Sequence, residues 1–344
     1  MLPETMRAMW CERPQEVELR RLPLPILGDE DVLVEVAYAA ICPWDVRAFS
    51  GLSSVLFPRL LGHEIAGRVA AVGKNVNHLQ IGQAVTPDMI VKCGTCKACR
   101  RGRSNRCQRP TFQQFGGGYA DFVRVPQSNI HPIPDGVSLK AAALMEPLAC
   151  VLRGQEMLNL YPGEVELVIG LGPIGAMHLQ VARAFGAQVI ASDPVAARLE
   201  QARALGATWT VNPMETDLAA FIQDVTGGWG VDAIALTVGS ARMVEEAARY
   251  LAPGGRLNIF AGIYPKEQVH LDPNQIHYGE WVITGSADST PTNMSRALDL
   301  IAAGQVQTER LVSHLLPLEA LAQGFDLVKN RVGHKIMIEV NGER

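Results

Sequence analysis

Four cysteines lie close together in the first third of the sequence. The stretch KCGTCKACRRGRSNRC spaces them as C-x2-C-x2-C-x7-C, and they are Cys93, Cys96, Cys99 and Cys107. Four thiolates on a short loop can surround a zinc ion tetrahedrally and leave no position open, which is typical of a structural zinc site. A bacterial ferredoxin run has three residues before its last cysteine and a proline after it, whereas here seven residues precede it and Gln108 follows. The spacing therefore predicts a structural zinc lobe at about residues 92–108.

Disulfides are the alternative use of these thiols. The first residues, MLPETMRAMW, contain no basic segment followed by an apolar core, so we expect no signal peptide and a cytoplasmic protein. Thiols stay reduced in that compartment, which favours the metal. Basic side chains near a tetrathiolate could offset its negative charge, and they could also form a solvated surface. They are Lys92, Lys97, Arg100, Arg101 and Arg103.

A second group of possible metal ligands lies closer to the N-terminus. Cys42 is followed by Asp45, and His63 and Glu64 come about twenty residues later. Thiolates, imidazoles and carboxylates are all zinc ligands, so this group could form another metal site. The residue at position 44 is an indole, Trp44, where a small hydroxyl would be easier to explain.

The stretch VELVIGLGPIGAMHLQVARAFG contains a glycine-rich turn of the form G-x-G-x-x-G. An apolar strand precedes the turn and a helix follows it, as a dinucleotide-binding turn requires. Gly170 permits a tight turn, Gly172 lets the backbone approach a pyrophosphate, and Gly175 lets the helix pack closely on the strand. The helix N-terminus, with Pro173 and Ile174, is expected to face the phosphates.

An acid in the expected place predicts which dinucleotide binds. The next strand, AQVIASD, ends in Asp193, about twenty residues after the turn. A carboxylate there accepts hydrogen bonds from the adenosine ribose and repels a 2′-phosphate, so we predict NAD and not NADP. We place Arg198, on the following helix, in the same cofactor site. The alternative is a doubly wound domain whose glycine turn binds nothing.

Composition excludes several classes of protein. The chain has 344 residues, of which 48% are hydrophobic and 19% charged, so a large core is possible and two domains are expected. The net charge is -4 and no basic run is long enough to follow a phosphate backbone, so we expect no nucleic-acid partner. No apolar stretch reaches the roughly 18 residues of a membrane span, so we expect no membrane partner.

The order of predicted elements gives an α/β fold. The first 140 residues contain short apolar or alternating runs bounded by Gly, Pro and Asn, which predict β-structure. From about residue 141, short apolar strands alternate with amphipathic helices, as in the βαβ units of a doubly wound parallel sheet. The segment WVITGSA is expected to be one more buried strand of that sheet. A helix and the strand HKIMIEV close the chain.

Taken together, these segments resemble the zinc-dependent medium-chain dehydrogenases, in particular the sorbitol (L-iditol) and threonine dehydrogenase branch. The matching stretches span essentially the whole chain and are GHEIAGRVAAVG, the four-cysteine lobe, GGGYADFVRVP, MEPLAC, GLGPIG and LVSHLLPLEALAQGFDLV. The resemblance implies a GroES-like β-rich catalytic domain from residues 1–148 and 290–344, and a Rossmann NAD-binding domain from 149–289. It also implies a homo-oligomer, either a dimer or a tetramer.

The family's catalytic zinc ligands map onto Cys42 and His63. The carboxylates of the sorbitol type match Glu64, after the histidine, and Glu146, in MEPLAC, so the resemblance implies one thiolate, one imidazole and a carboxylate with a position left open. Asp45 matches the family's acid that holds the histidine ring and its tautomer. Two zinc ions per chain are therefore expected, one catalytic and one structural.

The residues after Cys42 depart from the family pattern. The family usually has Ser or Thr two residues after this cysteine and often His two residues after the aspartate, which together relay a proton, whereas this chain has Trp44 and Arg47. An indole donates but cannot accept, and a guanidinium stays charged. Three interpretations stay open: the proton leaves through water held by Glu64 or Glu146; Trp44 is a pocket wall and Arg47 binds an anion; or catalysis has been lost.

The expected function is that of a zinc-dependent oxidoreductase. NAD would take a hydride from a secondary alcohol, a small polyol, cyclitol or sugar alcohol, and zinc would act as a Lewis acid on the hydroxyl to give a ketone. The alternatives are an L-threonine or amino-alcohol dehydrogenase, and a non-catalytic protein that binds NAD and zinc.

Overall fold

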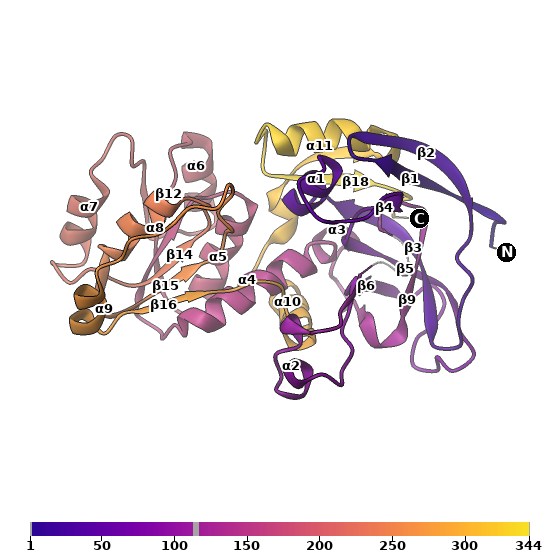
Figure 1. Cartoon of the computed structure of the whole chain (residues 1–344), viewed down its shortest axis with the longest axis horizontal. Coiled ribbons are helices and arrows are strands. Elements are labelled where there is room, and N and C mark those ends of the chain that lie inside the picture. Colours follow the sequence, from indigo (N-terminus) through magenta and orange to yellow (C-terminus); the bar gives the residue numbers. More distant parts are fainter. Residues whose placement is uncertain (1, 113–116, 344) are drawn as a thin grey trace. The chain divides into compact units, whose positions relative to one another are not determined.

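The computed structural model describes residues 2–112 and 117–343 of the chain, so Gly116, which opens the GGGYADFVRVP motif, lies outside the described residues. It contains two compact units (Figure 1). One is formed by residues 1–147 together with 290–344, and the other by residues 148–289. Both ends of the chain thus belong to one unit. Among the described residues, no helix is long and apolar enough to cross a membrane.

The first unit is built mainly from β-strands. Its larger sheet has the order β10-β6-β5-β3-β18-β17, with β9 also paired to β3. These strands are β3 (Asp31–Ala40), β5 (Glu64–Val72), β6 (Ala84–Pro87), β9 (Phe122–Pro126), β10 (Ile130–Pro132), β17 (Val312–Pro317) and β18 (Lys335–Glu339). A smaller sheet contains β1 (Thr5–Arg13), β2 (Glu16–Pro23) and β4 (Arg59–Leu60), and a two-stranded ribbon contains β7 (Ile90–Val91) and β8 (Thr111–Phe112).

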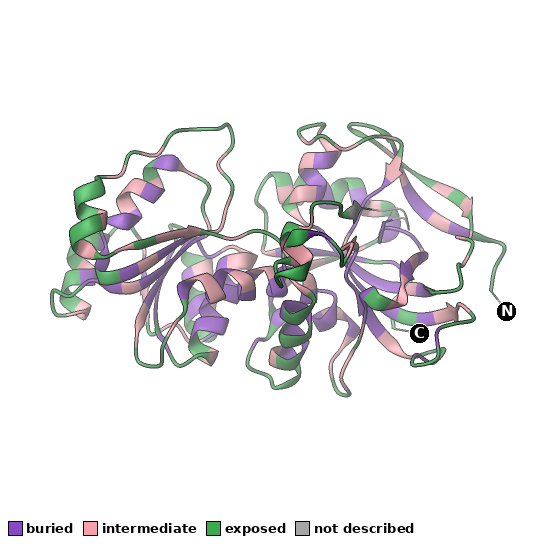
Figure 2. Ribbon diagram, turned by 60° about the horizontal axis from the view of Figure 1, so that its bottom comes forward, coloured by how far each residue is buried: buried purple, intermediate pink, exposed green. Residues whose placement is uncertain are grey.

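The N-terminal and C-terminal segments of the unit are joined where β18 pairs antiparallel with β3, with Met337 opposite Ala40. This pairing brings a segment near the C-terminus beside the strand that leads into Cys42. The unit also contains the α-helices α1 (Pro43–Phe49), α2 (Lys97–Arg100), α3 (Leu139–Ala142), α10 (Pro291–Ala302) and α11 (Leu321–Lys329). Buried residues from both ends of the chain, including Ile41 and Phe325, share one apolar core (Figure 2).

The second unit is a doubly wound parallel sheet of order β13-β12-β11-β14-β15-β16. The strands are β11 (Val165–Ile169), β12 (Gln188–Ser192), β13 (Trp209–Val211), β14 (Val231–Leu236), β15 (Leu251–Ile259) and β16 (Val282–Gly285). The helices are α4 (Met145–Leu158), which begins in the first unit, α5 (Pro173–Ala184), α6 (Ala196–Ala204), α7 (Leu218–Val225), α8 (Ala241–Ala248) and α9 (Pro273–Gly279).

The predicted fold class, a β-rich unit with a doubly wound parallel sheet, is confirmed. One detail differs from the sequence prediction. The segment WVITGSA forms β16, which is the last strand of its sheet and not a buried one, and Val282 there is 48% exposed. Its apolar residues resemble those of an interior strand, but among the described strands β16 pairs with β15 alone.

Candidate metal centres and cofactor site

The four cysteine sulfurs of the lobe come together. Cys93, Cys96, Cys99 and Cys107 each offer a sulfur, and all four sulfurs lie within 4.8 Å of one another. They are carried by the short helix α2 and the turns around it. Backbone N–H groups point at them: Cys96 N donates to the Cys93 sulfur at 3.4 Å, and Arg109 N donates to the Cys107 sulfur at 3.4 Å.

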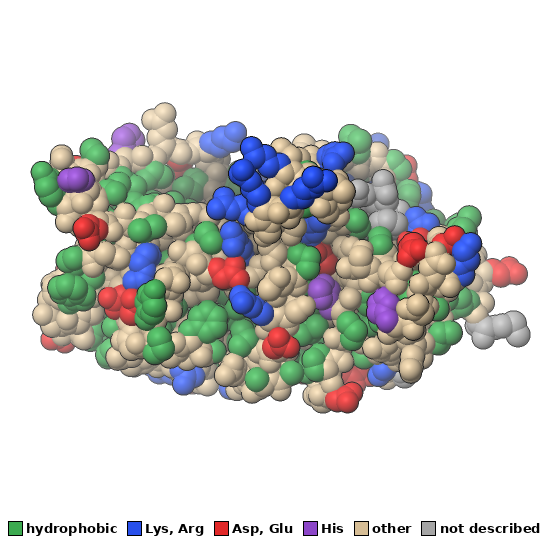
Figure 3. All heavy atoms as spheres, turned by 90° about the horizontal axis from the view of Figure 1, so that it is seen from below, with side chains coloured by type: hydrophobic (Ala, Val, Ile, Leu, Met, Phe, Trp, Pro, Cys, Tyr) green, Lys and Arg blue, Asp and Glu red, His purple; other side chains and the backbone are tan. Residues whose placement is uncertain are grey.

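These backbone donors favour thiolates. The N–H groups of Thr95 and Cys96 lower the pKa of Cys93 to about 5. Burial raises the pKa of Cys99 to about 12, so the four thiols would not all ionise without a cation between them. Zinc supplies that charge, and the four sulfurs fit a closed tetrahedral site. Lys and Arg side chains gather on this part of the surface in Figure 3. Of the five basic residues that were expected to offset the charge of the thiolates, Lys92 instead pairs with buried Asp88.

The second candidate centre joins Cys42, His63 and Glu64, whose ligand atoms also lie within 4.8 Å of one another. Cys42 is the N-cap of α1, and Pro43 at the first helical position pre-sets the backbone there. Asp45 completes a capping box with Cys42, so the sequence CPWD builds the start of the helix and the site together. His63 follows Gly62, and Glu64 opens β5.

Asp45 holds the histidine. It is completely buried, and its Oδ1 lies 3.3 Å from His63 Nδ1 and accepts from the Gly62 N–H at 3.2 Å. Burial raises the pKa of Asp45, but the contact with His63 and the backbone donors outweigh burial, and the pKa is lowered overall. Because Asp45 lies beside Nδ1 at ion-pair distance and not in hydrogen-bond geometry, the other ring nitrogen is the one better placed for a metal.

Lys335 is a residue of this centre that sequence reasoning missed. Its Nζ lies 2.7 Å from Glu64 Oε1 and 2.5 Å from Glu64 Oε2, and both side chains are buried. Lys335 opens β18, and the pairing of β18 with β3 carries it to Glu64. The only sequence signal was a lysine at the start of the apolar run KIMIEV.

Glu146 lies apart from the three clustered ligand atoms. It is half-buried in the first turn of α4, and its negative charge helps to raise the pKa of Lys335. Burial lowers the pKa of His63, but Asp45 and Cys42 outweigh it and raise that pKa well above its ordinary value. The centre therefore favours positive charge, as a cation-binding site should.

Trp44 stands beside the histidine. Its ring meets the His63 ring edge to face, with centroids 5.6 Å apart and planes at 84°. Arg47 is half-buried in the last turn of α1. The two residues that replace the usual proton relay are thus on the helix that begins at Cys42, and Trp44 packs against His63, a candidate metal ligand.

The glycine-rich turn of the second unit has the geometry of a dinucleotide-binding turn. Gly170 has φ +88°, and a Cβ on Gly175 would lie 1.8 Å from the Gly170 carbonyl oxygen, so both positions need glycine. Gly172 is the N-cap of α5, and a Cβ there would meet nothing within 4 Å. Pro173 is the first residue of the helix, so the N-terminus of α5 opens at this turn.

Asp193 lies directly beside the turn. Its Oδ2 accepts the Leu171 N–H at 2.7 Å, its Oδ1 accepts the Val195 N–H at 2.9 Å, and Arg198 Nη1 approaches Oδ2 at 3.4 Å. The structure thus brings together the predicted cofactor residues from the turn, from the end of β12 and from α6. The carboxylate is 2% exposed, and its position is fixed by backbone donors.

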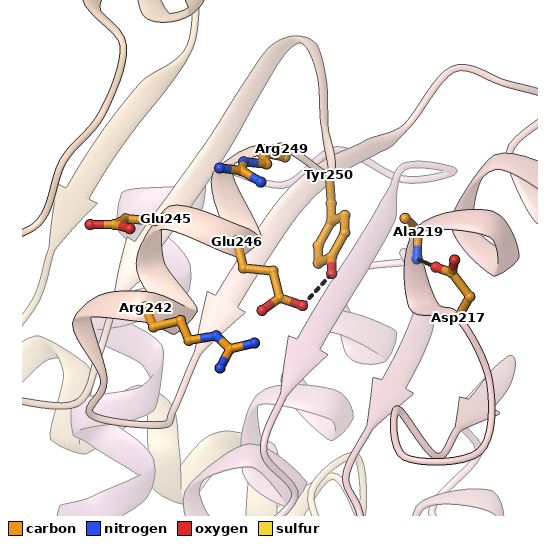
Figure 4. Close-up of a pocket in the computed structure, with 7 residues that line it drawn as sticks. All are labelled: Asp217, Ala219, Arg242, Glu245, Glu246, Arg249 and Tyr250. Carbon is orange, nitrogen blue, oxygen red and sulfur yellow. Dashed lines mark hydrogen bonds between the residues drawn. The ribbon is translucent and has the colours of Figure 1, made fainter.

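A surface cavity of about 580 Å³ lies elsewhere in this unit, between α7 and α8 (Figure 4). Its lining mixes two arginines with three acids, and none of the predicted cofactor residues lines it. The lining residues are Asp217, Ala219, Arg242, Glu245, Glu246, Arg249 and Tyr250. Tyr250 donates to Glu246 across the cavity wall at 2.8 Å.

Comparison with known proteins places this arrangement in a family. Residues 28–135 match the model of the alcohol dehydrogenase GroES-like domain, and residues 173–303 match the model of the zinc-binding dehydrogenases. The fold and site thus define an oxidoreductase that combines a zinc-binding unit with a dinucleotide-binding unit. The chain belongs to the zinc-binding dehydrogenases of the alcohol dehydrogenase type.

Three relatives show how far the likeness extends. The chain is 31% identical to the L-galactonate-5-dehydrogenase of Escherichia coli, over 95% of this chain and 97% of that one. It is 32% identical to the sorbitol dehydrogenase of Bacillus subtilis, over 92% of each chain. A protein of Sinorhizobium meliloti described as a zinc-binding dehydrogenase, solved with NADP bound, has a TM-score of 0.92 and 30% identity, over 98% of this chain and 100% of that one.

Proposed function

We propose that this protein oxidises a secondary hydroxyl of a small polyol, cyclitol or sugar alcohol to a ketone, with NAD as the hydride acceptor. The observation that carries the proposal is the cluster of one thiol, one imidazole and one carboxylate at Cys42, His63 and Glu64, in which the carboxylate is buried against a charged lysine. The names of two relatives, a sorbitol dehydrogenase and an L-galactonate-5-dehydrogenase, support the substrate class.

The residues around the centre divide the chemical work. When bound, zinc would supply Lewis acidity toward the substrate hydroxyl and NAD would accept the hydride. Cys42 and His63 would hold the metal, and Asp45 would keep the His63 ring and its tautomer in place. Trp44 would form a wall of the substrate pocket next to His63.

The proton route follows from what the neighbouring groups can accept. The Trp44 N–H cannot accept a proton and the Arg47 guanidinium keeps its own. Both oxygens of Glu64 are engaged by Lys335 Nζ, so this carboxylate already has a cationic partner. We therefore assign the proton to water held by the Glu146 carboxylate, and Glu146→Gln should lower kcat more than KM.

Turnover with a substrate panel tests the function. The zinc-loaded protein should form NADH with one or more polyols, cyclitols or sugar alcohols, and the matched variant Cys42→Ser should not. Turnover of L-threonine and no polyol would favour the amino-alcohol alternative. NAD and zinc binding without turnover of any alcohol would favour a non-catalytic protein and would refute the proposal.

We also propose that the chain acts in the cytoplasm as a homo-oligomer that pairs through β16. Within residues 2–112 and 117–343 this strand has a partner on one side only, and Val282 on it is 48% exposed. An unpaired strand edge is a ready template for a second strand. Light scattering should give a dimer or tetramer, and Val282→Lys should shift it to monomer. A native monomer would overturn this assembly.

A further inference from the structure

We propose that Tyr119 is a positioning residue of the Cys42–His63–Glu64 centre: its hydroxyl fixes Asp45 and, through Asp45, the ring of His63. The inference rests on the proposed function only in that this centre binds a metal. Tyr119 comes from the GGGYADFVRVP stretch, which sequence reasoning connected with the family but to which it assigned no chemical role.

The contact is short and buried. The Tyr119 hydroxyl lies 3.0 Å from Asp45 Oδ2 and 3.3 Å from the Ala40 carbonyl oxygen, and the residue is 0% exposed. A phenol has one proton to donate. The charged carboxylate is the nearer and stronger acceptor, so the proton belongs to Asp45.

Without this hydroxyl, one oxygen of Asp45 would be poorly held. Asp45 Oδ1 accepts from the Gly62 N–H and lies 3.3 Å from His63 Nδ1. Asp45 Oδ2 accepts from Tyr119 and, at 3.3 Å, from the Cys42 N–H. The hydroxyl is therefore the closest donor to the carboxylate and the one that fixes its rotation about the Cβ–Cγ bond.

The glycines of two motifs bring Tyr119 to this position. Gly118 N donates to the Gly62 carbonyl at 2.9 Å, and Tyr119 N donates to the Leu61 carbonyl at 3.2 Å. A Cβ on Gly117 would lie 2.2 Å from the Leu61 oxygen, so a larger residue could not approach as closely. The segment before Tyr119 thus runs directly along the segment before His63.

Aromatic packing fixes the Tyr119 ring itself. Phe325 of α11 meets it edge to face, with centroids 6.0 Å apart, and Phe325 in turn packs on Phe49 of α1. Because packing already fixes the ring, the hydrogen bond from its hydroxyl to Asp45 costs little further side-chain entropy. Phenylalanine should fill the same space, so removal of the oxygen alone is a fair test.

The test measures metal affinity and does not depend on turnover. Zinc affinity of the centre is determined for wild type and Tyr119→Phe by competition with a chromophoric chelator, and the absorption spectrum of the cobalt-substituted centre is recorded. We expect affinity to fall roughly tenfold, as for other partners of metal-bound histidines, and the cobalt bands to shift. The zinc of the four-cysteine lobe should be unaffected and serves as an internal reference.

A matched control and a double substitution make the result specific. Tyr38→Phe removes the hydroxyl of another buried tyrosine of the same unit, on β3, and should leave the zinc affinity unchanged. In an Asp45→Asn background, Tyr119→Phe should add nothing, because its effect passes through the carboxylate.

Several outcomes would overturn the inference. Unchanged zinc affinity and cobalt spectrum in Tyr119→Phe, with or without a fall in Tm, would make the hydroxyl a packing feature only. An equal loss at both zinc sites, or full additivity with Asp45→Asn, would point to general destabilisation. If wild type binds no metal at this centre, the inference fails with its premise, whereas metal binding without turnover would refute the proposed function and leave the role of Tyr119 intact.

Discussion

The four-cysteine lobe and the Cys42–His63–Glu64 centre are both candidate zinc sites, yet they are built in opposite ways. The ligands of the lobe lie within fifteen residues, are surrounded by exposed basic side chains, and receive backbone N–H groups of the same loop. The ligands of the centre come from α1 and from the start of β5, and they depend on Lys335 near the C-terminus.

This difference separates a site that stabilises from a site that can react. The lobe places four similar sulfurs around one point, which leaves no position for another ligand. The centre mixes a thiol, an imidazole and a carboxylate, and it surrounds them with buried charged partners in Asp45 and Lys335. Such buried pairs are sensitive to the loss of either member, so the two sites should respond differently to substitution.

The largest expected effect is on activity. Cys42→Ser should lower kcat/KM by roughly a thousandfold or more, because a metal contributes several kcal/mol to catalysis. It should also reduce the zinc content from two ions per chain to one, measured by elemental analysis. Cys93→Ser should remove the other zinc and lower Tm. Loss of both ions from Cys42→Ser would show that the two sites are not independent.

The next effect is on stability. Lys335→Met leaves the Glu64 carboxylate buried without its cation and should cost about 3–5 kcal/mol of unfolding free energy, measured with urea. Lys335→Arg keeps the charge and serves as the conservative control. In the lobe, Lys97→Met changes an exposed residue and should cost less than about 0.5 kcal/mol. Equal losses of unfolding free energy in Lys335→Met and Lys97→Met would contradict the view that only the Cys42–His63–Glu64 centre depends on a buried charge pair.

The choice between NAD and NADP should depend on the charge of Asp193, which lies close to the glycine-rich turn in the sequence. We expect NAD to be preferred over NADP by on the order of a hundredfold in kcat/KM, because Asp193 would face the 2′-phosphate at close range. Asp193→Ser removes that charge and leaves Arg198, now 3.4 Å from the carboxylate, to bind the phosphate. The ratio of kcat/KM with NAD to kcat/KM with NADP should then fall. Adding Arg198→Ala should raise this ratio again, because the phosphate loses its cation. Similar use of both cofactors by wild type would refute the role of Asp193.

The smallest effect concerns a buried group of the second unit. Burial raises the pKa of Glu166 from 4.5 to about 8, while Gln155 donates to it at 2.8 Å and buried His178 has a pKa lowered to about 3. Because the folded pKa is the higher one, the stability that Glu166 contributes is complete below about pH 4.5 and is lost as the pH rises to about 8.

Glu166→Gln should remove this dependence. As the pH rises from 6 to 7, the unfolding free energy of wild type should fall by about 1 kcal/mol relative to that of the variant. A difference of one bound proton between the folded and unfolded states changes this free energy by about 1.4 kcal/mol per pH unit. Parallel stability curves for the two proteins across this range would mean that Glu166 is already ionised in the fold. Glu164→Gln is the matched control, because the pKa of Glu164 is lowered by Arg256 after burial is counted.

Much of this protein follows from local sequence. Glycines at 170, 172 and 175 stand between a strand and a helix, and the turn depends on residues close in the sequence, because Gly170 has a positive φ and Gly175 packs against the Gly170 carbonyl oxygen. The alternation of apolar strands and amphipathic helices specifies a parallel sheet, because each element must bury one face against the next. The four cysteines need only their own loop to come together. All of these features were predicted from the sequence.

Two partners of the Cys42–His63–Glu64 centre, Lys335 and Tyr119, were decided by tertiary structure, whereas Asp45 was expected from the resemblance. Lys335 is separated from Glu64 by 271 positions in the sequence. Its ammonium group contacts Glu64 because β18 pairs with β3. Tyr119 reaches Asp45 because glycines let its segment run along Leu61 and Gly62. The edge position of β16 likewise depends on which strands lie beside it. A residue's type shows what it can donate or accept, but the free energy of a buried charge depends on which group the fold places against it.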